Sequence, residues 1–244
     1  MTEETLFKGD LRFFQPEKGY RFSVDSVLLA HYIYPQAGHS ILDLGAGCGI
    51  ISLILAYRWP EVRITALELQ DSLYRLLKSN LEINDYAGRL KSIQGDFRRI
   101  REIVPAEFFD LVVSNPPYRT VTSGRQNPES EEAIARHELK ANLSEAVTAA
   151  SYAVCNRGRV AFIYPAQRLA GLMETMRENR LEPKRLQMVH GHPGVHAKMV
   201  LLEAVKNGDE ELKILPPFFI YKKKRGEYTA GMAALYNTNY KDKK

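Results

Sequence analysis

The feature that most constrains the fold is a short apolar run that ends in a glycine-rich turn. Residues 41–44 (ILDL) have the pattern of a strand, and they lead directly into residues 45–49 (GAGCG) and then into the apolar stretch 50–59. Glycines spaced two apart allow a tight turn and let the backbone approach a ligand, while the first N–H groups of a following helix are free. The sequence therefore predicts a strand, a ligand-binding turn and a helix in succession.

The same alternation continues along the chain. Further strands are predicted near 62–68, 90–95, 108–114 and 159–164, and helices near 49–58, 71–83, 139–155 and 166–180. Two more strand-like runs, near 184–190 and 196–205, flank the turn 191–194 (GHPG) and predict an antiparallel hairpin. This order predicts an α/β, Rossmann-like fold with a mostly parallel seven-stranded sheet, a C-terminal antiparallel hairpin and helices on both faces. Ligands of such sheets bind beyond the carboxyl ends of the strands.

The glycine spacing favours a ligand without a pyrophosphate. Gly45, Gly47 and Gly49 form the pattern G-x-G-x-G, and Ile50 stands where the dinucleotide fingerprint requires a further glycine. S-adenosylmethionine carries no phosphate, so it is the predicted cofactor.

Three acidic residues at successive strand ends strengthen that prediction. They are Asp43, Glu68 and Asp96. Glu68 is placed to accept hydrogen bonds from two ribose hydroxyls, and Asp96 to accept one from the adenine amino group. Each of them alone fits equally well as a helix N-cap, a position that favours Asp.

The tetrapeptide after the fourth predicted strand indicates methyl transfer to an amino group. It consists of Asn115, Pro116, Pro117 and Tyr118. An exocyclic amine such as adenine N6 is a poor nucleophile, and a side-chain amide oxygen plus a backbone carbonyl that accept its two N–H groups stabilise the charge that grows during attack. Successive prolines fix the backbone, and an aromatic ring can stack on a planar substrate. A simple Pro-Pro turn at a strand end is the alternative.

Charge and composition set broad limits. The 244 residues carry a net charge of +5, which permits a polyanionic partner without requiring one. Positive charge is concentrated at residues 222–225 and at the C-terminal end, with a further patch at Arg98, Arg99 and Arg101. The predicted RNA contacts are Lys222, Lys223, Lys224 and Arg225. Neighbouring aromatic residues at 218, 219, 221 and 228 are either base-stacking surfaces or core.

No apolar run approaches the length of a membrane span, and the first residues are polar and acidic, so a cytoplasmic protein without membrane contact is expected. Two cysteines give neither a disulfide framework nor a metal-ligand spacing. Three histidines near the hairpin, at 190, 192 and 196, match no zinc pattern, so no metal site is predicted.

The polar stretch 119–138 directly follows the tetrapeptide and is expected to contact substrate.

Several segments together closely resemble bacterial tRNA adenine N6-methyltransferases that modify the adenine beside the anticodon of valine tRNA. The resemblance runs from end to end and is carried by residues 17–30 (EKGYRFSVDSVLLA), 43–49, 115–118 and 135–138 (ARHE), and by Tyr221 with residues 226–229. It implies a single methyltransferase domain over 1–244, in which residues 1–39 cover the cofactor and residues 40–244 form the catalytic core. The cofactor residues that it implies in the first segment are Gln15, Arg21, Phe22 and Asp25. Arg119 departs from the family, which tends to have an aromatic residue there.

Four other functions remain open from the sequence. A glutamine N5-methyltransferase uses the same tetrapeptide, but only 40 residues precede Ile41, too few for its helical substrate domain. A guanine N2-methyltransferase of ribosomal RNA tends to carry Phe at the position of Tyr118. A DNA adenine methyltransferase would need a larger insertion for reading sequence. The last alternative is a scaffold that binds the cofactor without catalysis.

Overall fold

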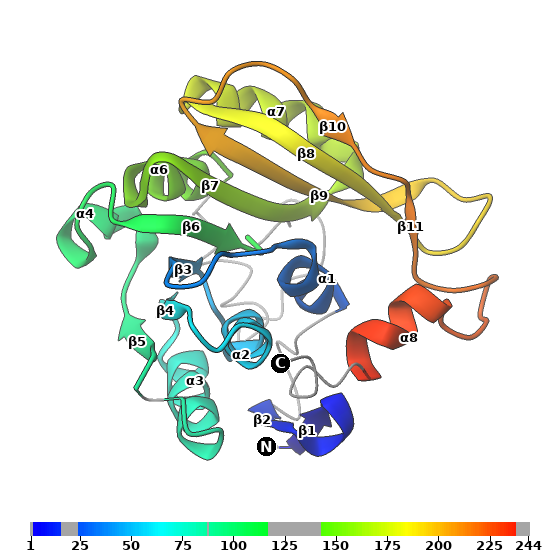
Figure 1. The fold of residues 1–244 in the computed structure, drawn as a ribbon, viewed down its shortest axis with the longest axis horizontal. Helices are drawn as coiled ribbons and strands as arrows, with labels where there is room; N and C mark the ends of the chain where they lie inside the picture. The colour runs from blue at the N-terminus through cyan, green and yellow to red at the C-terminus, as the bar shows by residue number, and fades with distance from the viewer. Residues whose placement is uncertain (1, 16–23, 87, 117–142, 238–244) are drawn as a thin grey trace, which may run out of the picture.

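The computed structural model describes residues 2–15, 24–86, 88–116 and 143–237, and in these residues a nine-stranded sheet forms the centre of the molecule (Figure 1). Its seven long strands lie in the order β8-β9-β7-β6-β3-β4-β5. They are β3 (Ser40–Leu44), β4 (Arg63–Glu68), β5 (Leu90–Gln94), β6 (Phe109–Ser114), β7 (Val154–Pro165), β8 (Leu181–His190) and β9 (Ala197–Lys206). Strand β9 runs antiparallel to both of its neighbours, and the other pairs in this series are parallel. The predicted mostly parallel seven-stranded sheet with a C-terminal hairpin is therefore confirmed.

Two very short strands extend the edge beyond that prediction. Strands β10 (Lys213–Ile214) and β11 (Phe218–Phe219) both pair with β8 in parallel. Strand β7 also begins earlier than predicted, at Val154, directly after helix α6 (Leu143–Ala153). Its first part is irregular, because the β6–β7 register shifts between Phe109 and Leu111 and Arg157 has a left-handed φ of 63°. A period-two pattern cannot be seen across such a break.

Helices cover both faces of the sheet, as predicted. Helices α1 (Val24–Tyr32), α2 (Ile50–Arg58), α3 (Asp71–Ile83) and α8 (Ala230–Asn237) pack on one face, and α4 (Ile100–Ile103), α6 and α7 (Leu169–Glu178) pack on the other (Figure 1). Short 3₁₀ turns at Phe97–Arg99 and Ala166–Arg168 precede α4 and α7. Neighbouring strand residues alternate between the two cores: Ile41 belongs to the first and Leu42 to the second. None of the helices in the described residues is both long enough and apolar enough to cross a membrane.

Residues 2–15 form a separate hairpin that was not predicted from the sequence. Strands β1 (Thr2–Leu6) and β2 (Leu11–Gln15) pair antiparallel around the 3₁₀ turn Phe7–Gly9. Leu11 and Phe13 are buried in the first core, and β2 packs against α2 and α3. Helix α1 is itself part of that core, since all seven residues from Ser26 to Tyr32 are buried.

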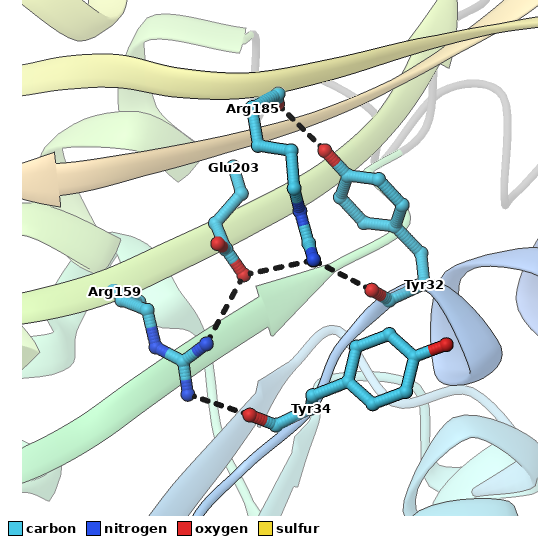
Figure 2. A network of polar contacts seen from close by, with 5 residues as sticks. All are labelled: Tyr32, Tyr34, Arg159, Arg185 and Glu203. Atoms are coloured by element: carbon cyan, nitrogen blue, oxygen red, sulfur yellow. Dashed lines mark hydrogen bonds and ion pairs between the residues drawn. The ribbon is translucent and has the colours of Figure 1, made fainter. Parts of the chain in front are cut away.

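A polar network connects the end of α1 to strands β7, β8 and β9 (Figure 2). Glu203 on β9 is 6% exposed and accepts from Arg159 at 3.5 Å and from Arg185 at 3.3 Å. Arg185 also donates to the Tyr32 carbonyl at 2.6 Å, and the Tyr32 hydroxyl donates back to the Arg185 carbonyl at 2.6 Å. Arg159 donates to the carbonyl of Tyr34 at 2.9 Å. One carboxylate thus orients two guanidinium groups, and those groups fix the backbone at the end of α1.

Replacing Glu203 with Ala should destabilise the protein by about 2–4 kcal/mol, because two largely buried guanidinium groups lose their shared counter-ion. Urea denaturation measures the change in the free energy of unfolding. Asp209→Ala is the matched control, since it breaks the ion pair of Arg157 at a carboxylate whose side chain is 86% exposed. Equal effects of the two substitutions would contradict the structural role of Glu203.

Candidate active site

The four predicted site strands place their carboxyl ends side by side. The N–H groups of Gly45 and Ala46 both donate to the Leu67 carbonyl at 2.9 Å, and Gly95 N–H donates to the Glu68 carbonyl at 2.9 Å. On the other side of β3, the Ser114 hydroxyl donates to the Leu44 carbonyl at 2.7 Å. The glycine turn therefore lies between the end of β6, which carries Asn115, and the end of β4, which carries Glu68.

The glycine turn requires its glycines. Gly45, Gly47 and Gly49 have φ angles of 78°, 60° and 88°, in the left-handed region that other residues rarely adopt. Gly49 is also needed for space, since a Cβ there would lie 2.4 Å from Cδ1 of Leu77 on α3. The turn and α3 are therefore in close contact at this glycine.

The Glu68 carboxylate holds the glycine turn through a hydrogen bond to its backbone. Its Oε2 accepts from the Gly47 N–H at 2.7 Å, and its Oε1 accepts from the Gln70 N–H at 2.7 Å. The side chain is 5% exposed. Each carboxylate oxygen has a further lone pair, so these bonds leave acceptor capacity for a ligand.

Asp43 is completely buried behind the turn. Its Oδ2 accepts from the Ser52 hydroxyl at 2.7 Å and from the Ser52 N–H at 3.2 Å, which joins β3 to α2. Its Oδ1 has no hydrogen-bond partner. Burial raises the pKa of Asp43 to about 7, the bonds from Ser52 oppose that shift, and the charge of Glu68 adds to it. The unpartnered Oδ1 of Asp43 and the neighbouring Glu68 carboxylate are acceptors that suit a ligand with N–H or O–H donors.

Asp96 occupies the predicted place at the end of β5, but it is already engaged. Its carboxylate caps the following turn by accepting from the Arg98 N–H at 2.9 Å, and it forms an ion pair with the Arg98 guanidinium. These contacts, chiefly the side-chain bond from Arg98, lower the pKa of Asp96. The N-cap alternative is therefore realised, and a ligand would have to share this carboxylate with Arg98.

Asn115 follows the last residue of β6, and its side-chain oxygen Oδ1 is the acceptor of interest. Its amide Nδ2 donates to the Ser26 hydroxyl on α1 at 3.4 Å, and its buried Oδ1 has no hydrogen-bond partner among the residues that the structure describes. Pro116, the next residue, is buried. Pro117 and Tyr118 lie outside the described residues.

The residues implied by the resemblance are only partly described. Gln15 is 1% exposed at the end of β2, and its Oε1 has no partner. Asp25 lies in the first turn of α1, next to Ser26. Arg21, Phe22 and the stretch 119–138 lie outside the described residues.

The two basic patches differ in how they are paired. In the first, Arg98 and Arg99 form ion pairs with Asp96 and Glu102, and Arg101 lies over the ring of Tyr152. In the second, all four side chains from 222 to 225 are exposed on a turn closed by the bridge between Tyr221 and Tyr228. We call residues 221–228 the basic turn. Within it Lys222 pairs with Glu227 at 2.9 Å.

A column of three tyrosines supports the basic turn. The ring of Tyr228 stacks on Tyr221 at 5.3 Å and on Tyr236 of α8 at 5.8 Å. The Tyr228 ring therefore packs against tyrosines of both the turn and α8, and the residue remains 37% exposed. Tyr236 lies on α8, which contacts α1, the helix that carries Ser26.

The histidines of the hairpin engage the backbone: the Nδ1 atoms of His190 and His192 lie 2.8 Å from the carbonyls of Val195 and Pro193. The described residues contain no group of three side chains arranged to hold a metal. Ser26 and Ser52, which orient Asn115 and Asp43, were missed by the sequence reasoning. The only signal for Ser26 was its position inside the segment 17–30.

Comparison with known proteins gives the family. Residues 21–141 match the family model described as methyltransferase small domain. A tRNA1(Val) (adenine(37)-N6)-methyltransferase of Porphyromonas gingivalis is 31% identical over 75% of this chain and 73% of its own length. The enzyme of the same name from Shewanella baltica is 26% identical over 91% and 92% of the two chains.

Solved structures give the fold. A predicted O-methyltransferase of Agrobacterium tumefaciens superposes with a TM-score of 0.72 at 22% identity, covering 88% of this chain and 96% of that one. A methyltransferase of Pyrococcus furiosus has a TM-score of 0.59 at 18% identity, covering 80% and 89%. The sequence relatives and the shared Rossmann-like fold agree, and the chain belongs to the family of the tRNA1(Val) (adenine(37)-N6)-methyltransferases.

Proposed function

We propose that the protein transfers a methyl group from S-adenosylmethionine to the exocyclic N6 amine of an adenine in tRNA. The observation that carries the chemistry is the buried, unpartnered Oδ1 of Asn115 at the carboxyl edge of the sheet. A buried acceptor without a donor is costly to keep, so it favours a ligand that brings an N–H group. The names of the relatives supply the choice of adenine N6 in tRNA.

The protein's part in the reaction is to orient and polarise the amine. Asn115 Oδ1 accepts one N–H of the amine, and the Pro116 carbonyl accepts the other, so the nitrogen lone pair turns toward the methyl group. The cofactor supplies an electrophilic methyl on a positively charged sulfur. Transfer of that methyl group to the amine nitrogen would leave the electron pair of the C–S bond on sulfur, and the nitrogen would then lose one proton to water. Positioning supplies much of the acceleration.

The cofactor would lie along the glycine turn. Glu68 accepts from the ribose hydroxyls, Asp96 from the adenine amino group, and the buried acceptors of Asp43 and Gln15 suit the cofactor's other donors. Arg21, Phe22 and Asp25 remain candidates for the same pocket, and Pro117 and Tyr118 for the base.

The basic turn would hold phosphates of the RNA. Its lysines and arginine are all exposed and Lys222 pairs with Glu227, whereas Arg98 and Arg99 both pair with carboxylates of nearby residues. The tyrosine column joins this turn to α8, and α8 contacts α1, the helix that carries Ser26.

Asn115→Ala should lower the rate of methyl transfer by roughly two to three orders of magnitude, as expected when one preorganised acceptor is lost at a developing charge. Cofactor affinity should be unchanged, because Asn115 contacts the amine. Single-turnover kinetics and calorimetry measure the two quantities. Ser26→Ala, which keeps Oδ1, is the matched control and should lose far less activity. A parallel loss of cofactor binding in Asn115→Ala would assign the residue a structural role.

Glu68→Ala should weaken cofactor binding by about 1.5–3 kcal/mol, the range for a hydrogen bond to a charged group. Because Glu68 also binds the Gly47 N–H, calorimetry should compare S-adenosylhomocysteine with its 2′-deoxy analogue. If Glu68 binds the ribose, the natural protein should prefer the hydroxylated ligand and the variant should not. A preference retained in the variant would remove Glu68 from the ribose site.

Replacing Lys222, Lys223 and Lys224 together with Ala should weaken tRNA binding and lower its salt dependence. For a single-stranded loop, the log–log slope should fall by about 0.7 for each phosphate that the variant no longer neutralises. Cofactor affinity should stay the same. The matched control is Arg63, Lys91 and Lys213, three exposed cations on β4, β5 and β10. An equal change in the salt slope for both triple variants would show that the basic turn has no special role.

A further inference from the structure

Helix α3 and its C-cap residue each carry an asparagine, Asn80 and Asn84, and both pair with the N-terminal hairpin as a neighbouring strand would. Asn80 accepts from the Phe14 N–H at 2.6 Å and donates to the Phe14 carbonyl at 2.9 Å. Asn84 does the same for Arg12, accepting from its N–H at 3.0 Å and donating to its carbonyl at 2.6 Å. The spacing fits on both sides, because residues four apart share a helix face and residues two apart share a strand edge.

Only Asn80 also reaches the glycine turn. Its Nδ2 donates a second hydrogen bond, to the carbonyl of Cys48 at 2.8 Å. Asn84 uses its second donation on the carbonyl of Asn80, within the same helix. Asn80 is fully buried and bonds to three backbone groups from two distant segments.

The contacts around Asn80 leave the turn little freedom. Phe14 packs against Cys48, Leu73 and Leu76, and Leu77 contacts Gly49. Cys48 stands between Gly47 and Gly49, two glycines that alone would let the intervening peptide rotate. The bond from Asn80 fixes the direction of the Cys48 carbonyl, and with it the peptide plane that joins the turn to α2.

We propose that Asn80 is a positioning residue for cofactor binding, which locks the glycine-rich turn to the N-terminal hairpin. The proposal rests on the cofactor site assigned above. Asn80 acts through the turn and not by touching the cofactor. Because the coupling is reciprocal, a ligand seated on the turn should also hold the hairpin more firmly.

Calorimetry with S-adenosylhomocysteine tests the first half of the proposal. Asn80→Ala should weaken binding about tenfold or more, since a buried hydrogen bond that orders the turn is lost. Asn80→Asp is nearly isosteric and keeps an acceptor for Phe14, but it faces the Phe14 and Cys48 carbonyls without a donor, so it should bind at least as weakly. Asn84→Ala is the matched control, because it removes the same pairing one helical turn away and should leave affinity unchanged.

The thiol of Cys48 tests the second half without using activity. Cys48 is 2% exposed, and burial raises its pKa to about 12, so it should react slowly with a thiol reagent while the hairpin is docked. In a Cys155→Ser background, Asn80→Ala should speed the labelling of Cys48, and S-adenosylhomocysteine should slow it. Asn84→Ala should speed it less.

The outcomes separate this proposal from the proposed function. If the natural protein does not bind S-adenosylhomocysteine, the cofactor assignment fails. If the natural protein binds S-adenosylhomocysteine, and if Asn80→Ala and Asn80→Asp lose thermal stability but keep full affinity for it, Asn80 is purely structural and the proposal is overturned. A selective loss of affinity in the two Asn80 variants, with faster labelling of Cys48, supports it.

Discussion

The left-handed backbone at Gly45, Gly47 and Gly49 is the constraint on which the rest of the candidate site depends. A turn of this kind has little structure of its own, so its shape must come from what surrounds it. Strand β4 supplies the Leu67 carbonyl and the Glu68 carboxylate, and α3 supplies Leu77 and Asn80. The parallel sheet and α3 therefore determine the shape of the turn, because they hold its N–H groups and the carbonyl of Cys48 in hydrogen bonds within the protein.

The main elements of the fold follow from short-range patterns in the sequence. The seven long strands and helices α2, α3 and α7 have clear periodicity or apolar runs, and all were predicted, most of them close to their observed bounds, although β7 begins earlier than predicted. Helix α1 was not predicted, because it is buried on nearly all sides and so lacks the alternation of apolar and polar faces that marks a surface helix. The hairpin β1–β2 does alternate, with Leu11, Phe13 and Gln15 directed inward, and the sequence Lys8-Gly9-Asp10 between its strands was an available turn signal.

The site was predictable in position but less so in detail. Topology alone places Asn115, Glu68 and Asp96 at one edge, since parallel strands end together. What each side chain does there depends on partners that are remote in sequence, as with Ser26 and Asn115, which lie 89 residues apart. Asp96 is the exception, because its partner Arg98 is only two residues away and an Asx-type cap could have been expected. Asn80 gave no signal, since asparagine within a helix usually faces solvent.

The tyrosine column also affects the net charge near the basic turn at high pH. Burial raises the pKa of Tyr236 well above its ordinary value, with the neighbouring tyrosines and Asp25 adding to the effect, and the pKa of Tyr228 is raised as well. Because both shifts are upward, Tyr228 and Tyr236 stay neutral even in alkaline solution, and phenolate charge on these two rings does not offset the positive potential of residues 222–225 there. Tyr228 and Tyr236 thus support the basic turn by packing alone and place no negative charge beside its cations.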